Sequence, residues 1–162
     1  MIYLLDANTY IEAKNRYYDM EFCPAYWDWL DQQFVMGVAG SIDMIGRELR
    51  DGNDGLAEWV KERGSQFIAN DDEDTQNTFI AIAQFVMSQD FSPANRDNFL
   101  EKADPWLIAK AKTTGATVVT HESALSNATK KVKVPNICRQ FDVRCIDTFA
   151  FLRETRAKFC LS

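Results

Sequence analysis

Short apolar runs that end at polar residues recur along this chain, and segments with helical spacing separate them. Ile2 to Leu5 is the first such run, and it stops at Asp6. Val38 to Ile42 and the β-branched Thr117 to Thr120 have the same character. Runs of this length are typical of strands that are buried on both faces of a parallel sheet.

Helical patterns fill the intervals between these runs. Residues 25–36 place Tyr26, Trp29, Leu30 and Phe34 at helical spacing, which we interpret as a stripe facing the core and not as a platform for bases. The other expected helices cover 9–14, 44–49, 56–63, a segment after the acidic start at 71–74, 104–114 and 147–156, and short strands are expected at 67–69 and 143–146. Strands that alternate with helices predict an α/β fold, a three-layer α/β/α sandwich with a central parallel sheet.

The chain shows no repeat, low-complexity stretch or Pro/Gly-rich linker, so a single domain over residues 1–162 is expected. Its 162 residues, 46% of them apolar, can form a core without disulfides or a structural metal. No apolar run approaches the roughly 20 residues that cross a bilayer, and no basic lead-in precedes the first run. We therefore expect a cytosolic protein without a membrane partner.

Cysteine and histidine usage argues against a zinc site of the usual kind. Cys23, Cys138, Cys145 and Cys160 lack the close pairing that such sites need, and His121 is the only histidine. We expect the four thiols to be buried and reduced. His121 is expected to be structural and not a general acid.

Charge is unevenly distributed in this chain of net charge −6. Residues 1–122 carry 10 basic and 21 acidic side chains, a net −11, whereas residues 123–162 carry 8 and 3, a net +5. An acidic body is not typical of a broad electrostatic binder of nucleic acid, but a local basic segment is compatible with one. We predict that Lys130, Lys131 and Lys133 contact phosphates, with a solvated surface loop as the alternative.

Four acidic residues from distant segments are predicted to face one edge of the sheet. Asp6 follows the first strand, and Glu48 lies about one turn into the helix after the second. Asp104 starts the helix before the next strand, and Glu122 lies just past the end of that strand. Open α/β sheets bind their ligands at the carboxyl ends of the strands, which is where these four residues would meet.

A cluster of carboxylates is costly unless it holds a proton or a cation. Two unit charges about 4 Å apart repel by roughly 4 kcal/mol at an effective dielectric near 20. Oxygen ligands without histidine or thiolate favour Mg²⁺ or Mn²⁺, and these ions can promote hydrolysis of a phosphodiester. Each acid also has a structural alternative: Asp6 and Asp104 as helix N-caps, Glu48 and Glu122 as exposed side chains.

These residues resemble the PIN-domain ribonuclease family, which includes VapC-type toxins. The segment YLLDANTYI at 3–11 is similar to that family's first strand and acidic turn, and SIDMIGREL at 41–49 to its second acidic motif. The third block of the family resembles ADPWLIAKAKTTGATVVTHE at 103–122, and the tail VPNICRQFDVRCIDTFAFLRE fits its closing strand and helix. The blocks cover nearly the whole chain in the family's order.

The resemblance implies a PIN-like domain with Mg²⁺- or Mn²⁺-dependent endoribonuclease activity. It implies that Asp6, Glu48 and Asp104 are metal ligands, with Asn8 supporting the first. Implied partners are the RNA substrate and, if the chain is the toxin of a toxin–antitoxin pair, an antitoxin protein. Aromatic residues expected to be exposed at 17–29 add a homodimer as an option.

The fourth acidic position of the family falls on Thr120-His121-Glu122 in this chain. The family usually has aspartate there, and glutamate reaches about one bond further. Glu122 is therefore expected to complete the catalytic set either directly or through water, with Thr120 as a supporting alternative.

Two other functions stay open at the level of sequence. A phosphatase-like hydrolase would use Asp6 as its nucleophile, although that chemistry usually has a second acid where this chain has Asn8. A non-catalytic PIN-like module that binds or regulates a partner is the third possibility.

Overall fold

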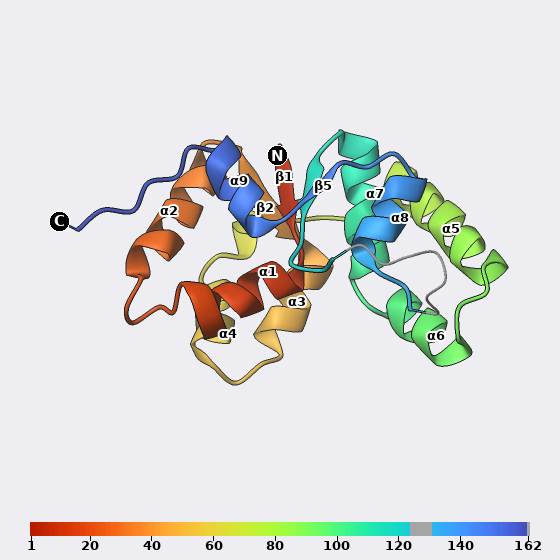
Figure 1. Cartoon of the computed structure of the whole chain (residues 1–162), viewed down its shortest axis with the longest axis horizontal. Helices are drawn as coiled ribbons and strands as arrows, with labels where there is room; N and C mark the ends of the chain where they lie inside the picture. The colour runs from red at the N-terminus through yellow and green to blue at the C-terminus, as the bar shows by residue number, and fades with distance from the viewer. Residues whose placement is uncertain (124–130, 162) are drawn as a thin grey trace.

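A computed structural model of the chain describes residues 1–123 and 131–161. Its centre is an all-parallel sheet of five strands in the order β3-β2-β1-β4-β5. Helices cover both faces of this sheet (Figure 1), so the predicted α/β class and three-layer arrangement are confirmed. The strands are β1 (Tyr3–Leu5), β2 (Ala39–Ile42), β3 (Phe67–Ile68), β4 (Thr117–Val119) and β5 (Cys145–Ile146).

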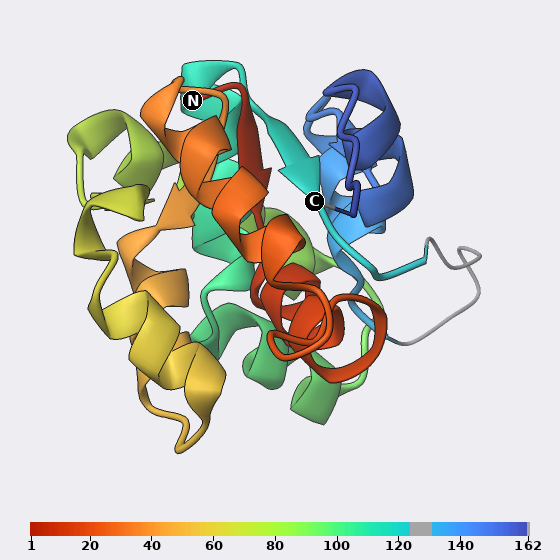
Figure 2. The same cartoon turned by 90° about the vertical axis from the view of Figure 1, so that its left-hand side faces the viewer.

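The helices divide between the two sides of the sheet. Figure 1 shows α1, α2 and α9 on one side and α5, α6, α7 and α8 on the other, and Figure 2 shows α2 lying across the face that it covers. Their bounds are α1 (Ala7–Glu12), α2 (Pro24–Val35), α3 (Asp43–Arg50), α4 (Gly55–Lys61), α5 (Glu73–Ser88), α6 (Pro93–Glu101), α7 (Asp104–Thr114), α8 (Val134–Gln140) and α9 (Thr148–Glu154).

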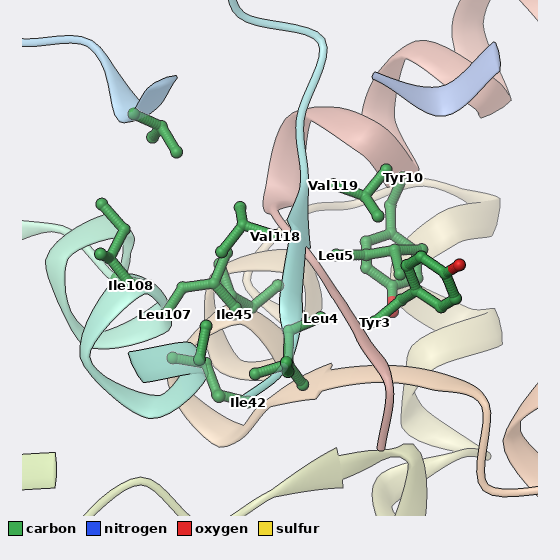
Figure 3. Packing of buried hydrophobic residues seen from close by; sticks show 14 of the residues in the cluster. Tyr3, Leu4, Leu5, Tyr10, Ile42, Ile45, Leu107, Ile108, Val118 and Val119 are labelled. Atoms are coloured by element: carbon green, nitrogen blue, oxygen red, sulfur yellow. The ribbon is translucent and has the colours of Figure 1, made fainter. Parts of the chain in front are cut away.

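The central strands are apolar on both faces, as their sequences predict. Figure 3 shows Val118 of β4 directed toward Leu107 and Ile108 of α7, while Leu5 and Val119 lie on the side of Tyr10. All of these side chains are almost completely buried. Helices on both faces therefore explain why the runs lack the polar alternation of a strand with one solvated face.

Four elements were not predicted, and each has a weak sequence pattern; the shortest is a 3-10 helix, Gly64–Gln66, before β3. A π-helix, Ala13–Tyr17, continues α1. Helix α6 buries only Phe99, and α8 is seven residues long, so neither shows a full apolar stripe. Both helices have a proline in the first turn. A proline at this position favours the start of a helix, and it is a stronger indication of these two helices than their apolar pattern.

Two predictions about burial need correction. Of the aromatic residues at 17–29, Tyr17 and Phe22 are exposed, but Tyr26 and Trp27 are buried in the core. The thiols are free, as expected, but only Cys138 is buried; Cys160 follows the last helix and is exposed, and Cys23 and Cys145 are partly exposed. In the part of the chain that the structure describes, no helix has the length and apolarity needed to cross a bilayer.

Close packing of α3 against β3 fixes the position of the helix that carries Glu48. A Cβ atom added at Gly46 would lie 2.9 Å from Cγ of Phe67. We expect Gly46→Ala to lower the free energy of unfolding by about 1–3 kcal/mol, because the Phe67 ring is buried and has little room to move. Urea unfolding measures this change, with Gly64→Ala as the control because a Cβ there meets nothing within 4 Å. Equal stability of the two variants would contradict the tight packing.

Candidate active site

Asp6 is the most enclosed of the predicted acidic residues, with 1% of its surface exposed at the end of β1. Its Oδ1 accepts hydrogen bonds from the backbone N and the hydroxyl of Thr9, both at 2.8 Å. Its Oδ2 accepts one from the hydroxyl of Thr120. Asp6 therefore acts as the N-cap of α1, as its structural alternative predicted, and about one of its four acceptor positions stays available, on Oδ2.

Glu48 is bonded to the backbone of the residue that precedes Asp104, at the start of α7. Although Glu48 is exposed overall, its Oε1 accepts a hydrogen bond from the backbone N of Ala103 at 2.9 Å. Asp104 is the first residue of α7, and Ala103 is the N-cap, without a side-chain capping bond. The prediction that Asp104 caps this helix is wrong, so capping does not explain an acidic residue at this half-buried position.

The charges of the other three acids all act on Asp104. Burial raises the pKa of Asp104 to about 7, and the negative charges of Asp6, Glu122 and Glu48 add to that rise. Burial likewise raises the pKa of Asp6 to about 6, against the hydrogen bonds from Thr120 and Thr9, which lower it. Asp104 is therefore within electrostatic range of the other three acids, and their role as one site stays a prediction.

Glu122 is held in place by two hydrogen bonds. Its backbone N donates to the hydroxyl of Thr120 at 3.1 Å, and its Oε2 accepts from the backbone N of Val134 at 2.8 Å. Val134 is the first residue of α8, so this hydrogen bond connects the segment that follows β4 to the start of that helix. Thr120 connects Glu122 to Asp6, because its hydroxyl also donates to Asp6. Glu122 is therefore not a free loop side chain.

The carboxylates do not form a ready-made coordination shell. Within residues 1–123 and 131–161, no three Asp, Glu, His or Cys side chains come close enough together to hold a metal ion. Glu48 and Glu122 each have one oxygen bonded to a backbone N–H instead. This arrangement is the one expected of like charges that separate and take up neighbouring donors.

A family model described as a domain of unknown function, DUF4411, matches residues 3–159. The chain belongs to the DUF4411 family. Its match extends over all four acidic positions, so the acidic cluster lies inside the DUF4411 domain. No curated protein and no solved structure matches the chain.

The basic segment of this DUF4411 domain lies next to Glu122. Lys131 is exposed and Lys133 is half-buried, and Lys133 directly precedes the residue whose backbone N–H binds Glu122. Lys130 lies outside the described residues. Lys133 therefore lies beside the residue that binds Glu122, and the phosphate contacts of both described lysines stay a prediction.

Thr9, and not Asn8, supports Asp6. Asn8 is exposed, whereas Thr9 is fully buried and supplies two of the three hydrogen bonds to Asp6. Thr9 was not predicted, although a threonine three residues after an N-cap aspartate is well placed to bond to it. Thr120 has the supporting position that was predicted for it.

His121 makes the contacts of a structural residue. Its Nε2 lies 2.8 Å from the hydroxyl of Thr148 at the start of α9, and its ring stacks on Tyr17. Burial lowers the pKa of His121, which keeps the ring neutral near pH 7. These contacts agree with the structural interpretation and give the ring a fixed orientation.

Proposed function

We propose that this DUF4411 protein is a Mg²⁺- or Mn²⁺-dependent endoribonuclease that hydrolyses RNA phosphodiester bonds. The observation that carries the proposal is the gathering of four carboxyl groups from four segments at the carboxyl edge of a parallel sheet, where α/β proteins bind their ligands. RNA as the substrate class rests on the resemblance of the acidic blocks to PIN-domain ribonucleases.

The donor set fits a hard divalent ion. Asp6, Glu48 and Asp104 offer carboxylate oxygens, and Asp6 keeps an open acceptor position on Oδ2. Glu48 and Glu122 would release Ala103 and Val134 and turn toward the ion, because a cation outweighs a single backbone hydrogen bond. When bound, Mg²⁺ or Mn²⁺ supplies positive charge to the phosphate oxygens and lowers the pKa of an attacking water.

The protein's own residues would orient the ligands and the substrate. Thr9 and Thr120 hold the Asp6 carboxylate in one orientation from opposite oxygens. Glu122 would complete the acidic set directly or through water, while Lys131 and Lys133 contact flanking phosphates. Asp6 would thus be a ligand of fixed orientation, and Glu48 and Glu122 would join it by exchanging their backbone hydrogen bonds for the ion.

Cleavage of a fluorescently labelled single-stranded RNA tests this proposal. We expect cleavage with Mn²⁺ and none in excess EDTA, because the carboxylates cannot replace the charge of the ion. Asp6→Asn is expected to lose cleavage and also the rise in melting temperature that Mn²⁺ causes, since an ion that binds only the folded state stabilises it. Asp97→Asn, an exposed change on α6, is the matched control. Equal cleavage in EDTA, or by the Asp6→Asn variant, would refute the proposal.

The alternatives make different predictions in the same experiments. A non-catalytic binding module would show no RNA cleavage and no stabilisation by Mn²⁺. A phosphatase with Asp6 as nucleophile would turn over small phosphomonoesters, but both Asp6 oxygens already accept hydrogen bonds and the side chain is buried, which favours a ligand role.

We also propose a cytosolic location, which agrees with four free thiols. An antitoxin protein and a second copy of the chain stand as proposed partners. Co-expression with a neighbouring reading frame and sedimentation of the purified chain test them separately.

A further inference from the structure

Three rings from distant segments form a compact stack at the surface beside the candidate active site. The rings of Tyr17 and His121 are nearly parallel, with an interplanar angle of 7° and centroids 5.5 Å apart. Phe149, from the first turn of α9, meets both edge-on, at 5.3 Å from Tyr17 and 6.1 Å from His121. We call these three residues the aromatic platform.

The outer member of the platform is open to solvent. Tyr17 keeps 43% of its surface exposed, although His121 lies parallel to its ring. The ring of His121, on which Tyr17 stacks, is held by a hydrogen bond between its Nε2 and the hydroxyl of Thr148, which is buried. The platform is therefore a preformed aromatic surface and not a flexible side chain.

A rare backbone conformation puts Tyr17 in this position. Residues 13–17 form a π-helix, and the backbone N of Tyr18 bonds to the carbonyl of Ala13 at 2.7 Å. Segments of this kind occur frequently at functional sites, because the wider turn costs stability. Here it ends the first helix at Tyr17, in contact with the exit of β4.

The platform is one residue from the acidic cluster. His121 lies between Thr120, whose hydroxyl donates to Asp6, and Glu122, whose charge raises the pKa of Asp6 and Asp104. The exit of β4 therefore carries residues of both the platform and the acidic cluster.

We infer that the aromatic platform binds an unpaired nucleobase of the RNA by stacking on Tyr17. This inference rests on the proposed function and deepens it, because it assigns Tyr17 to the binding of a base beside the cleavage site. Stacking on an exposed ring needs a base that is free of its partner, and it tolerates any of the four bases. The acidic body of the protein adds little electrostatic affinity, so a stacking contact is a suitable source of binding energy.

A short single-stranded RNA that carries 2-aminopurine tests the inference without requiring cleavage. Binding is measured in Ca²⁺, with the RNA shown to be intact on a gel, and the emission of 2-aminopurine reports stacking. We expect the wild-type protein to quench the emission and Tyr17→Ala to lose the quenching and bind about tenfold more weakly. Tyr17→Phe should keep both, whereas Tyr17→Leu should lose the quenching, because leucine is apolar but has no ring.

Two controls separate the platform from general effects. Phe22→Ala removes another exposed ring, which is not part of the platform, and is expected to change neither signal. A duplex of the same sequence is expected to show no quenching.

Equal quenching and affinity for wild type and Tyr17→Ala would overturn the inference, as would a wild-type protein that leaves the emission unchanged. Retention of affinity by Tyr17→Leu would also overturn it, and would indicate an apolar docking surface for a protein. Mn²⁺-dependent cleavage by the wild type, measured separately, decides the proposed function whatever the outcome at Tyr17.

Discussion

Asp104→Asn is expected to lower Mn²⁺-dependent RNA cleavage by about a thousandfold and, at the same time, to raise the melting temperature of the metal-free protein by about 5 °C. Cleavage falls because the variant loses one of the proposed carboxylate ligands. Stability rises because the same carboxylate is buried close to Asp6, Glu122 and Glu48, and its charge opposes theirs. The two effects have opposite signs, so misfolding cannot produce both.

The experiment compares wild type, Asp104→Asn and Asp97→Asn at pH 8, in EDTA for melting and in Mn²⁺ for cleavage. Asp97 is exposed on α6 beside Arg96, so its change should affect neither quantity strongly. Full cleavage by Asp104→Asn would remove this residue from the site. If Asp104→Asn is less stable than wild type in EDTA, the charge of Asp104 makes favourable interactions in the folded protein that outweigh the repulsion from the other acids.

The metal-free protein is expected to lose stability as the pH rises from about 4 to about 7. Burial and the neighbouring carboxylates raise the pKa of Asp104 to about 7 and that of Asp6 to about 6 in the folded state, above the ordinary value of 3.8. The folded protein therefore holds these protons more tightly than the unfolded chain does, and their removal destabilises it, for Asp104 by on the order of 3 kcal/mol.

Urea unfolding of metal-stripped protein at pH 5 and pH 8 measures this dependence. The part due to Asp104 is the difference between wild type and Asp104→Asn, because groups that titrate alike in both proteins cancel in that difference. Saturating Mn²⁺ should reverse the loss at pH 8, because the ion binds the ionised carboxylates. If wild type and Asp104→Asn differ in their free energy of unfolding by the same amount at pH 5 and pH 8, the raised pKa of Asp104 is contradicted.

The central part of the fold was predictable because its strands are strongly patterned. The runs at β1, β2 and β4 are short, buried and free of charged residues, and they are followed by Asp6, Asp43 and Thr120, which marks both the strands and the edge where ligands bind. Gly115, in the left-handed region with φ of 75°, ends α7 where the sequence predicts. The amino-acid pattern alone therefore identifies the strands and the sheet edge at which the site is predicted.

The details of the site depended on contacts that have no local pattern. The hydrogen bond from Ala103 to Glu48 joins residues 55 positions apart, and it makes an exposed helix glutamate part of the site. The contacts of Tyr17 with His121 and Phe149 depend on the π-helix that ends the first helical segment. The amino-acid sequence of residues 13–17 has no pattern that indicates a π-helix. Tertiary contacts of this kind override the local preferences from which sequence analysis argues.

The anomalous difference map of a crystal soaked in Mn²⁺ tests whether a divalent ion binds at the carboxylates. The proposed function requires a peak that is bounded by the carboxylates of Asp6, Glu48 and Asp104, with Glu48 turned away from the backbone N of Ala103. A fully occupied peak elsewhere, or no peak while Glu48 keeps its bond to Ala103, would contradict the claim that a divalent ion joins these carboxylates.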